Sequence, residues 1–152
     1  MTDLRTALVV GDEMLAQWRH VHNAVVPPAA MSLARARERL GRNRLANAYL
    51  GEVLVGCSTV RPPAGEGGVA TVIARVLPEF RRRGFGTAIY EQALARARVL
   101  GAGVIETCVL AANEDGLRFA GRHGFAEVER YVLEGERDEW VDLRLSSDRG
   151  RD

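Results

Sequence analysis

The sequence predicts one α/β domain, of the α+β kind, with about four helices on a mixed, mostly antiparallel sheet of about six to seven strands. Two observations carry this prediction. A chain of 152 residues fits a single domain with its own hydrophobic core. Its apolar residues switch between strand and helix periodicity in the order β-α-α-β-β-β-α-β-α-β-β. No repeat or linker interrupts residues 1–145, which we expect to form the domain, and "SSDRGRD" at 146–152 is expected to be a disordered tail.

The first predicted strand covers residues 4–10, and a helix follows with Asp12 as its candidate N-cap. The segment "VVPPAA" breaks this helix. A second, short helix begins after Ser32, which is another candidate cap, and ends at Gly41.

A β-hairpin is predicted at residues 44–60, where two β-rich runs flank Gly51 and Glu52. Side chains should alternate between the two faces of its second strand. One face would carry Val53, Val55, Cys57 and Thr59. The next segment, "RPPAGEGG", has the composition of a loop, and a further strand at 69–77 is stopped by Pro78.

The second half of the chain predicts alternating helices and strands, then two closing strands. In order these are a helix at 86–100, a strand at 104–111, a helix at 113–123, and strands at 125–134 and 139–145. The β-α-β unit at 69–111 should make its two strands parallel neighbours in the sheet.

Composition excludes several classes of function. The net charge of +1 provides no field to attract nucleic acid or an anionic membrane, so neither is expected as a partner. No apolar run is long enough to span a bilayer and no signal peptide is visible, which predicts a cytoplasmic protein. The chain contains no lysine, which excludes phosphate loops and nucleophiles that need an amine side chain. Cys57 and Cys108 lie in apolar runs and are expected to be reduced, buried thiols.

The stretch "LPEFRRRGFGTA" at 77–88 places a glycine turn between a strand and a helix. The first amides of a helix lack intrahelical partners, and the helix dipole adds positive charge there. Glycine lets a ligand approach the backbone closely. This arrangement is a suitable phosphate site, although an isolated motif of this kind is also typical of an exposed basic turn.

A second cluster, "NEDGLRFAGRHGF" at 113–125, follows the next predicted strand. Together the two clusters resemble the GNAT superfamily of acetyl-CoA-dependent N-acetyltransferases. The first hallmark is matched by Val76, Pro78, Glu79, Phe80, Arg81, Gly84 and Gly86, and the second by Asn113, Gly124 and Phe125. The order of elements is similar over residues 4–145, whereas the specific motifs cover only 76–125.

This resemblance implies acetyl-CoA as cosubstrate, no metal, and transfer of an acetyl group to the amine of a small molecule or peptide. It implies that backbone groups around Arg75, Val76 and Leu77 bind the pantetheine arm and polarise the thioester carbonyl. It implies that Asn113 bonds the pantetheine or orders the end of its strand. The turn expected to hold the pyrophosphate consists of Arg81, Arg82, Arg83, Gly84, Phe85, Gly86 and Thr87.

The sequence departs from the family pattern at the general acid. Many members protonate the leaving thiolate with a tyrosine, and Ala120 occupies that position here. Tyr131 and Cys108 are alternative candidates, although their residue types favour a packing role for each, and water or the substrate's own proton would also serve. Glu106 interrupts an apolar strand and is the candidate base, if it faces the cleft rather than solvent.

The acceptor pocket implied by the family involves the first helix and the loop after it, which here suggests Trp18, His22 and Asn23. Direct attack by the amine is expected, because no nucleophile suited to a covalent relay is apparent. Loss of the usual acid keeps an alternative open, a non-catalytic acyl-CoA-binding sensor. The closing strands would also allow a homodimer.

Overall fold

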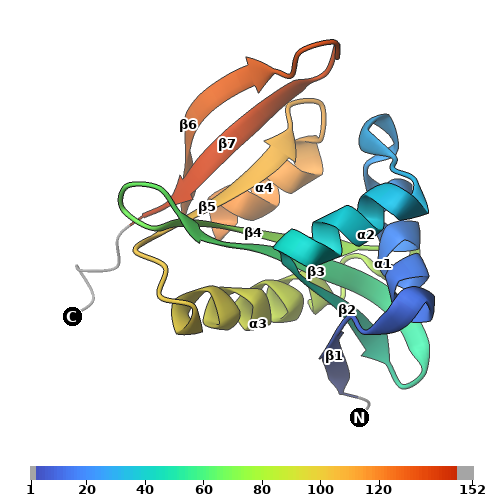
Figure 1. Ribbon diagram of the computed structural model, residues 1–152. Coiled ribbons are helices and arrows are strands. Elements are labelled where there is room, and N and C mark those ends of the chain that lie inside the picture. Colours follow the sequence, from blue (N-terminus) through green and yellow to red (C-terminus); the bar gives the residue numbers. More distant parts are fainter. Residues whose placement is uncertain (1–2, 147–152) are drawn as a thin grey trace.

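The computed structural model describes residues 3–146, and within them the predicted order of elements is confirmed (Figure 1). The seven strands and four helices are β1 (Leu4–Leu8), α1 (Gly11–Val25), α2 (Leu33–Arg42), β2 (Arg44–Leu50), β3 (Val53–Ala64), β4 (Val69–Val76), α3 (Phe85–Val99), β5 (Val104–Leu110), α4 (Glu114–Arg122), β6 (Phe125–Val132) and β7 (Glu139–Leu145). Short 3₁₀ turns lie at Pro27–Ala29 and Pro78–Phe80.

The strands form one sheet in the order β1-β2-β3-β4-β5-β7-β6. All neighbouring pairs are antiparallel except β4 and β5, which are parallel as the β-α-β pattern predicts. These two strands pair only from Val69–Val104 to Thr71–Glu106. Beyond that point they are no longer paired, so an opening in the middle of the sheet separates their C-terminal halves.

Helices cover both faces of the sheet. On one face, α1 and α2 pack through Leu15, Trp18 and Ala36 against β2 and β3. On the other, α3 and α4 pack through Tyr90 and Ala120, among others, against the centre of the sheet. Figure 1 shows α1 and α2 together, away from α3. The opening between β4 and β5 therefore connects two separate layers of helices.

The predicted helix caps differ in outcome. Ser32 caps α2, because its hydroxyl accepts a hydrogen bond from the Arg35 amide at 3.1 Å. Asp12 does not cap α1, since the helix already begins at Gly11. Its carboxylate lies in the first turn instead and forms an ion pair with Arg37 of α2 at 3.0 Å. An acid in the first turn still interacts favourably with the helix dipole.

The predicted alternation in β3 breaks at Val55. Ala48 pairs with Gly56 but Tyr49 pairs with Leu54, so Val55 is an extra residue in a β-bulge. As a result, Val55 packs towards Ile89 of α3, whereas Cys57 packs in the cluster beneath α1 and α2. β3 also extends to Ala64, into the segment expected to be a loop.

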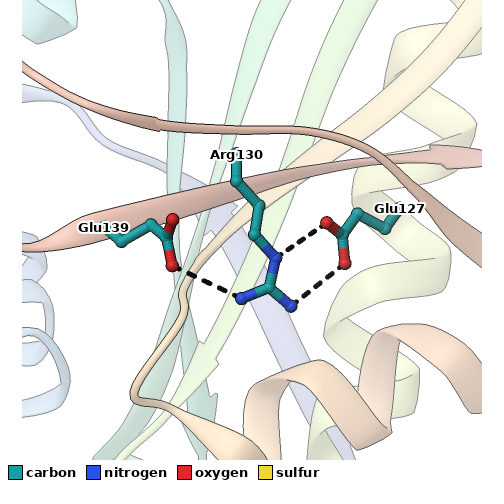
Figure 2. Close-up of polar contacts among 3 residues, drawn as sticks. All are labelled: Glu127, Arg130 and Glu139. Carbon is teal, nitrogen blue, oxygen red and sulfur yellow. Dashed lines mark hydrogen bonds and ion pairs between the residues drawn. The ribbon is translucent and has the colours of Figure 1, made fainter.

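β6 is an edge strand, and its exposed surface carries charge. Arg130 donates to Glu127 from Nε at 2.7 Å, and lies 3.4 Å from Glu139 at the start of β7 (Figure 2). Such exposed pairs contribute little stability, but charges on an edge strand discourage pairing with other chains. After β7, the Ser146 amide donates to the Gly124 carbonyl at 3.0 Å, and the rest of the predicted tail lies outside the described residues.

Between residues 3 and 146, none of the helices combines the length and apolar character needed to cross a bilayer.

Candidate active site

A cavity of about 80 Å³, which we call the slot, lies where β4 and β5 separate. Its walls are mainly apolar and include Val72 and Ala74 of β4 and Val109 of β5. Ala120 of α4 also lines it, so the position of the expected acid does face the slot, with only a methyl group.

The backbone of β4 offers unpaired groups to the slot. The Leu77 amide donates to the Val55 carbonyl of β3 at 2.9 Å. Successive amides of a strand point to opposite sides, so those of Ala74 and Val76 are directed away from β3, towards the side that β5 has left. The Val76 carbonyl on that side accepts a hydrogen bond from Arg81 Nε at 3.1 Å.

The turn before α3 leaves a group of amides without helical partners. Gly84 is the N-cap residue with φ of 82°, and Arg82 also has a positive φ, of 66°. The Ala88 amide donates to the Gly84 carbonyl at 3.3 Å as the helix begins. The amides of Phe85 to Thr87 lie ahead of this bond and are free to bind a ligand.

Gly86 is required by close packing rather than by backbone conformation. A Cβ atom there would lie 3.3 Å from the ring of Phe119 and 3.6 Å from a methyl group of Val76. Any larger side chain would fill the space between the start of α3, the end of β4 and α4. Gly86 therefore allows the first turn of α3 to pack closely against β4 and α4.

Asn113 connects the end of β5 to α4. Its side-chain oxygen accepts a hydrogen bond from the Gly116 amide at 3.0 Å and so caps the helix. Asn113 also lines the slot. Nearby, Thr87 Oγ1 lies 3.2 Å from His123 Nε2, which links the first turn of α3 to the end of α4.

A second cavity, of about 300 Å³, opens on the face covered by α1 and α2. Ile73, Arg75, Cys108 and Trp140 line both this cavity and the slot, so the two spaces meet at these four residues. The larger space is lined by Arg35, Arg39, Arg61 and Arg75, and we call it the arginine cavity.

The predicted pocket residues Trp18 and His22 line the arginine cavity, and Asn23 supports them. The Asn23 amide group is fixed by two hydrogen bonds to Met31, one to the carbonyl at 3.0 Å and one from the amide at 2.9 Å. Its oxygen therefore faces His22 Nδ1 at 3.1 Å, which makes Nδ1 the donor and Nε2 the acceptor. The ring of Trp18 stacks on His22 with centroids 5.3 Å apart.

His22 is neutral at physiological pH. Burial, assisted by the positive charge of Arg75, lowers its pKa from 6.5 to about 4, although the contact with Asn23 acts in the opposite direction. The residue is 5% exposed. It offers a lone pair rather than a charge to the arginine cavity.

Of the three predicted catalytic residues, two lie beside the cavities. Cys108 is at the junction of the two spaces. Tyr131 lines the arginine cavity, and its hydroxyl donates to Asp142 at 2.8 Å. Burial first, and then this hydrogen bond, raise the pKa of Tyr131 well above its usual value, so the phenol is protonated.

Glu106, the third, lines neither cavity. It lies where β4 and β5 are still paired, and its carboxylate accepts hydrogen bonds from Arg144 Nε at 3.1 Å and from a terminal nitrogen of Arg144 at 2.6 Å. An arginine on the neighbouring strand thus explains the charged residue in this apolar run.

Arg35, Arg39 and Arg61 were not among the predicted site residues, although the sequence contains a signal for them. Arg35 and Arg39 are four residues apart and share a face of α2. Arg61 continues the alternation of Cys57 and Thr59 in β3. The sequence does not indicate that this face of α2 and this face of β3 line the same cavity.

Within residues 3–146, no three His, Cys, Asp or Glu side chains are grouped so that they could hold a metal ion.

The parted strands, the free amides before α3 and the two connected cavities are the architecture of the GNAT fold. Residues 12–125 match the acetyltransferase (GNAT) family, and the chain belongs to this family. A search of curated proteins finds no significant relative.

Solved structures share the whole fold at low sequence identity. A protein assigned as a phosphinothricin N-acetyltransferase is 19% identical, with a TM-score of 0.78 over 95% of this chain and 100% of that one. The Salmonella typhimurium protein yncA, solved with its cofactor acetyl-CoA, is 16% identical, with a TM-score of 0.73 over 96% and 95%. The Escherichia coli ribosomal-protein-S18-alanine N-acetyltransferase is 15% identical, with a TM-score of 0.76 over 97% and 98%.

Proposed function

We propose that this chain transfers an acetyl group from acetyl-CoA to the amine of a small molecule or peptide. The observation that carries this proposal is the slot, which lies where β4 has parted from β5 and which meets a second cavity on the other face of the sheet. Acetyl-CoA would supply the acetyl group as a thioester. The acceptor amine would attack the carbonyl carbon directly, so that the C–N bond forms, the C–S bond breaks and coenzyme A leaves as a thiolate that takes a proton from water or the one that the amine gives up.

The residues along the slot fit the coenzyme. The free amides of Phe85, Gly86 and Thr87 are suited to the pyrophosphate, because they combine unpaired donors with the positive end of the α3 dipole. The amides of Ala74 and Val76 are suited to the pantetheine arm and to the thioester oxygen. Arg81, Arg82 and Arg83 add positive charge beside the turn, and Asn113 contributes its amide nitrogen at the slot.

Tyr131 is the residue we propose for the proton taken from the acceptor. An alkylamine is protonated at neutral pH and must lose a proton before it can attack. The Tyr131 oxygen can accept a hydrogen bond from the amine, and the carboxylate of Asp142 behind it can take up the proton that Tyr131 passes on. Cys108, at the junction, would lie beside the reacting thioester.

The proposal is tested by the variant Gly86→Val. Its side chain would fill the space between Phe119 and Val76, so we expect the Kd of acetyl-CoA to rise at least about tenfold. Binding is measured by calorimetry. Gly121→Ala in α4 is the matched control, because a Cβ atom there meets nothing within 4 Å. Equal affinity of a folded Gly86→Val protein would contradict the assignment of the turn before α3 to the coenzyme.

Transfer itself is tested by following free thiol from acetyl-CoA with a panel of amines. Thiol release that depends on an amine supports the enzyme. Coenzyme binding without release for any amine would instead favour the non-catalytic sensor, which the methyl group of Ala120 in the slot keeps as a second candidate. A cytoplasmic location and a homodimer remain predictions, the latter open to measurement by light scattering.

A further inference from the structure

The arginine cavity contains a buried positive charge with no counterion. Arg75 is 9% exposed, and no carboxylate of the described chain forms an ion pair or hydrogen bond with it. Burial lowers the pKa of Arg75, and its charged neighbour Arg61 acts in the same direction. Arg75 is also one of the four residues at which the cavity meets the slot.

Two further donors of the same cavity lack partners. Arg39 Nε and Trp140 Nε1 are both buried, and neither makes a hydrogen bond within residues 3–146. Both residues line the arginine cavity, and Trp140 lies with Arg75 at the junction. Hydrogen-bond donors that lack acceptors are thus concentrated in one place.

The other charged residues of the cavity do not compensate for these donors. Arg35 and Arg61 add two more positive charges, against a single acid, Glu136, which is exposed in the turn between β6 and β7. Arg61 donates to Cys108 Sγ at 4.0 Å, a weak interaction that leaves its charge unneutralised. The side chains that line the arginine cavity therefore carry a strongly positive net charge.

Buried charges and hydrogen-bond donors without partners destabilise the fold, and proteins retain them where a bound ligand supplies the counterion or the acceptor. We propose that the acceptor is a small amine that also carries an oxyanion, a carboxylate in the simplest case. The anionic group would be bound by Arg75 and Trp140 Nε1, with Arg39 and Arg61 beside it. This rests on the proposed acetyl transfer and adds to it the class of acceptor.

The size and position of the cavity agree with such an acceptor. A volume of about 300 Å³ is at the lower end of the range for small-molecule sites, and suits an amino acid. The phosphates of the coenzyme are not the missing anion, because the turn from Arg82 to Thr87 lines neither cavity. An anion held at Arg75 would leave the amine of the same molecule close to Tyr131 and the slot.

The experiment compares matched acceptors that differ only in the anionic group. Thiol release from acetyl-CoA is followed with L-α-amino acids, ω-amino acids and aminoalkylphosphonates, and with their carboxamides or neutral esters. Charge-assisted hydrogen bonds to an anion contribute enough that we expect kcat/KM to be at least about tenfold higher for the best anionic acceptor than for its neutral counterpart.

Variants of the cavity arginines test whether these residues cause the preference for anionic acceptors. Arg75→Gln and Arg39→Gln should each remove most of the preference for the anionic acceptor over its neutral counterpart, mainly by raising KM for the anionic acceptor. Arg42→Gln is the matched control on α2, since Arg42 is exposed, pairs with Glu38 at 3.3 Å and does not line the cavity. Arg39 is only half-buried, so its variant remains informative if Arg75→Gln does not fold.

Binding can be read without any turnover, because both tryptophans of the chain line the arginine cavity. Titration with each anionic acceptor, without acetyl-CoA, should change the intrinsic fluorescence of the natural protein, and Arg39→Gln should weaken that response at least about tenfold. An Arg39-dependent response without any thiol release would support the anion site and reject acetyl transfer. Equal kcat/KM for anionic and neutral acceptors, or no fluorescence response to any anion of the panel, would overturn the inference.

Discussion

The slot and the arginine cavity meet at four residues, yet they are built from different groups. The slot offers backbone amides of β4 between apolar side chains such as Val72 and Val109, and further free amides lie in the turn before α3. The arginine cavity offers side chains, several of them charged or carrying an unpaired donor. The groups available to a ligand are therefore mainly main-chain groups on one face of the sheet and side chains on the other.

This difference has a consequence for specificity. Main-chain amides are present in any sequence that adopts the fold, provided that glycines such as Gly86 leave room, so a coenzyme common to many enzymes can be bound with few fixed side chains. In the proposed function the acceptor binds on the other face of the sheet. There the arginines of α2, β3 and β4 are the side chains proposed to select the substrate.

The largest effect we expect comes from the two tryptophans of the arginine cavity. Trp18 is 1% exposed and its indole N–H donates to the Ser58 carbonyl at 3.1 Å, whereas the N–H of Trp140 has no partner. Trp18→Ala should lower the free energy of unfolding by about 3–5 kcal/mol. Trp140→Phe should lower it by less than about 1 kcal/mol, because no hydrogen bond is lost.

Urea denaturation followed by circular dichroism measures both changes. A cost for Trp140→Phe as large as that for Trp18→Ala would mean that the Trp140 indole N–H is bonded in solution, which would weaken the contrast between the two spaces.

A smaller effect should appear in the dependence of stability on pH, through one histidine on each face. The pKa of His22 in the folded chain is about 4 against 6.5 when unfolded, so between these values only the unfolded chain takes up the proton. The free energy of unfolding should be constant above about pH 7 and fall by roughly 2–3 kcal/mol as the pH drops from 6.5 to 4.

Urea denaturation from pH 4 to 8 measures this loss, and His22→Gln should remove most of it. His123 on the slot face provides the control, since burial also lowers its pKa, but in a more exposed position. If His123→Gln flattened the profile more than His22→Gln did, burial and the charge of Arg75 would not be lowering the pKa of His22 as the structure indicates.

Local signals in the sequence were sufficient to predict much of the fold. Ser32 caps its helix, the strands at 69–77 and 104–111 are parallel, and the order of elements agrees throughout the described chain. These features depend on neighbours along the chain, such as caps, periodicity and turn glycines. Asp12 shows what such local signals cannot predict, because its ion-pair partner Arg37 lies on another helix.

The arrangement of the site was harder to predict because it depends on register. Arg75 and Glu106 both interrupt apolar strands, so the sequence gives them the same signal. Glu106 is paired opposite Arg144 of β7, whereas Arg75 faces two cavities and no acid. A single bulge at Val55 also decides which face Cys57 and Arg61 share. Neither the residue opposite a given position in the sheet nor the position of a bulge can be predicted from a single sequence.

The smallest effect is expected at Glu106, and it separates the paired part of β5 from the part that lines the cavities. Glu106→Gln removes one charge from an ion pair whose arginine is half-exposed, so it should cost less than about 1 kcal/mol. It should leave kcat/KM within about twofold of the value for the natural protein, since Glu106 lines neither cavity.

Tyr131→Phe, which removes the hydroxyl that bonds Asp142, is the matched comparison and should lower kcat at least about tenfold. Steady-state kinetics with one acceptor shows which of the two residues, Glu106 or Tyr131, takes part in proton removal. If Glu106→Gln lowered kcat more than Tyr131→Phe did, the base would lie at the paired end of β5, outside the two cavities.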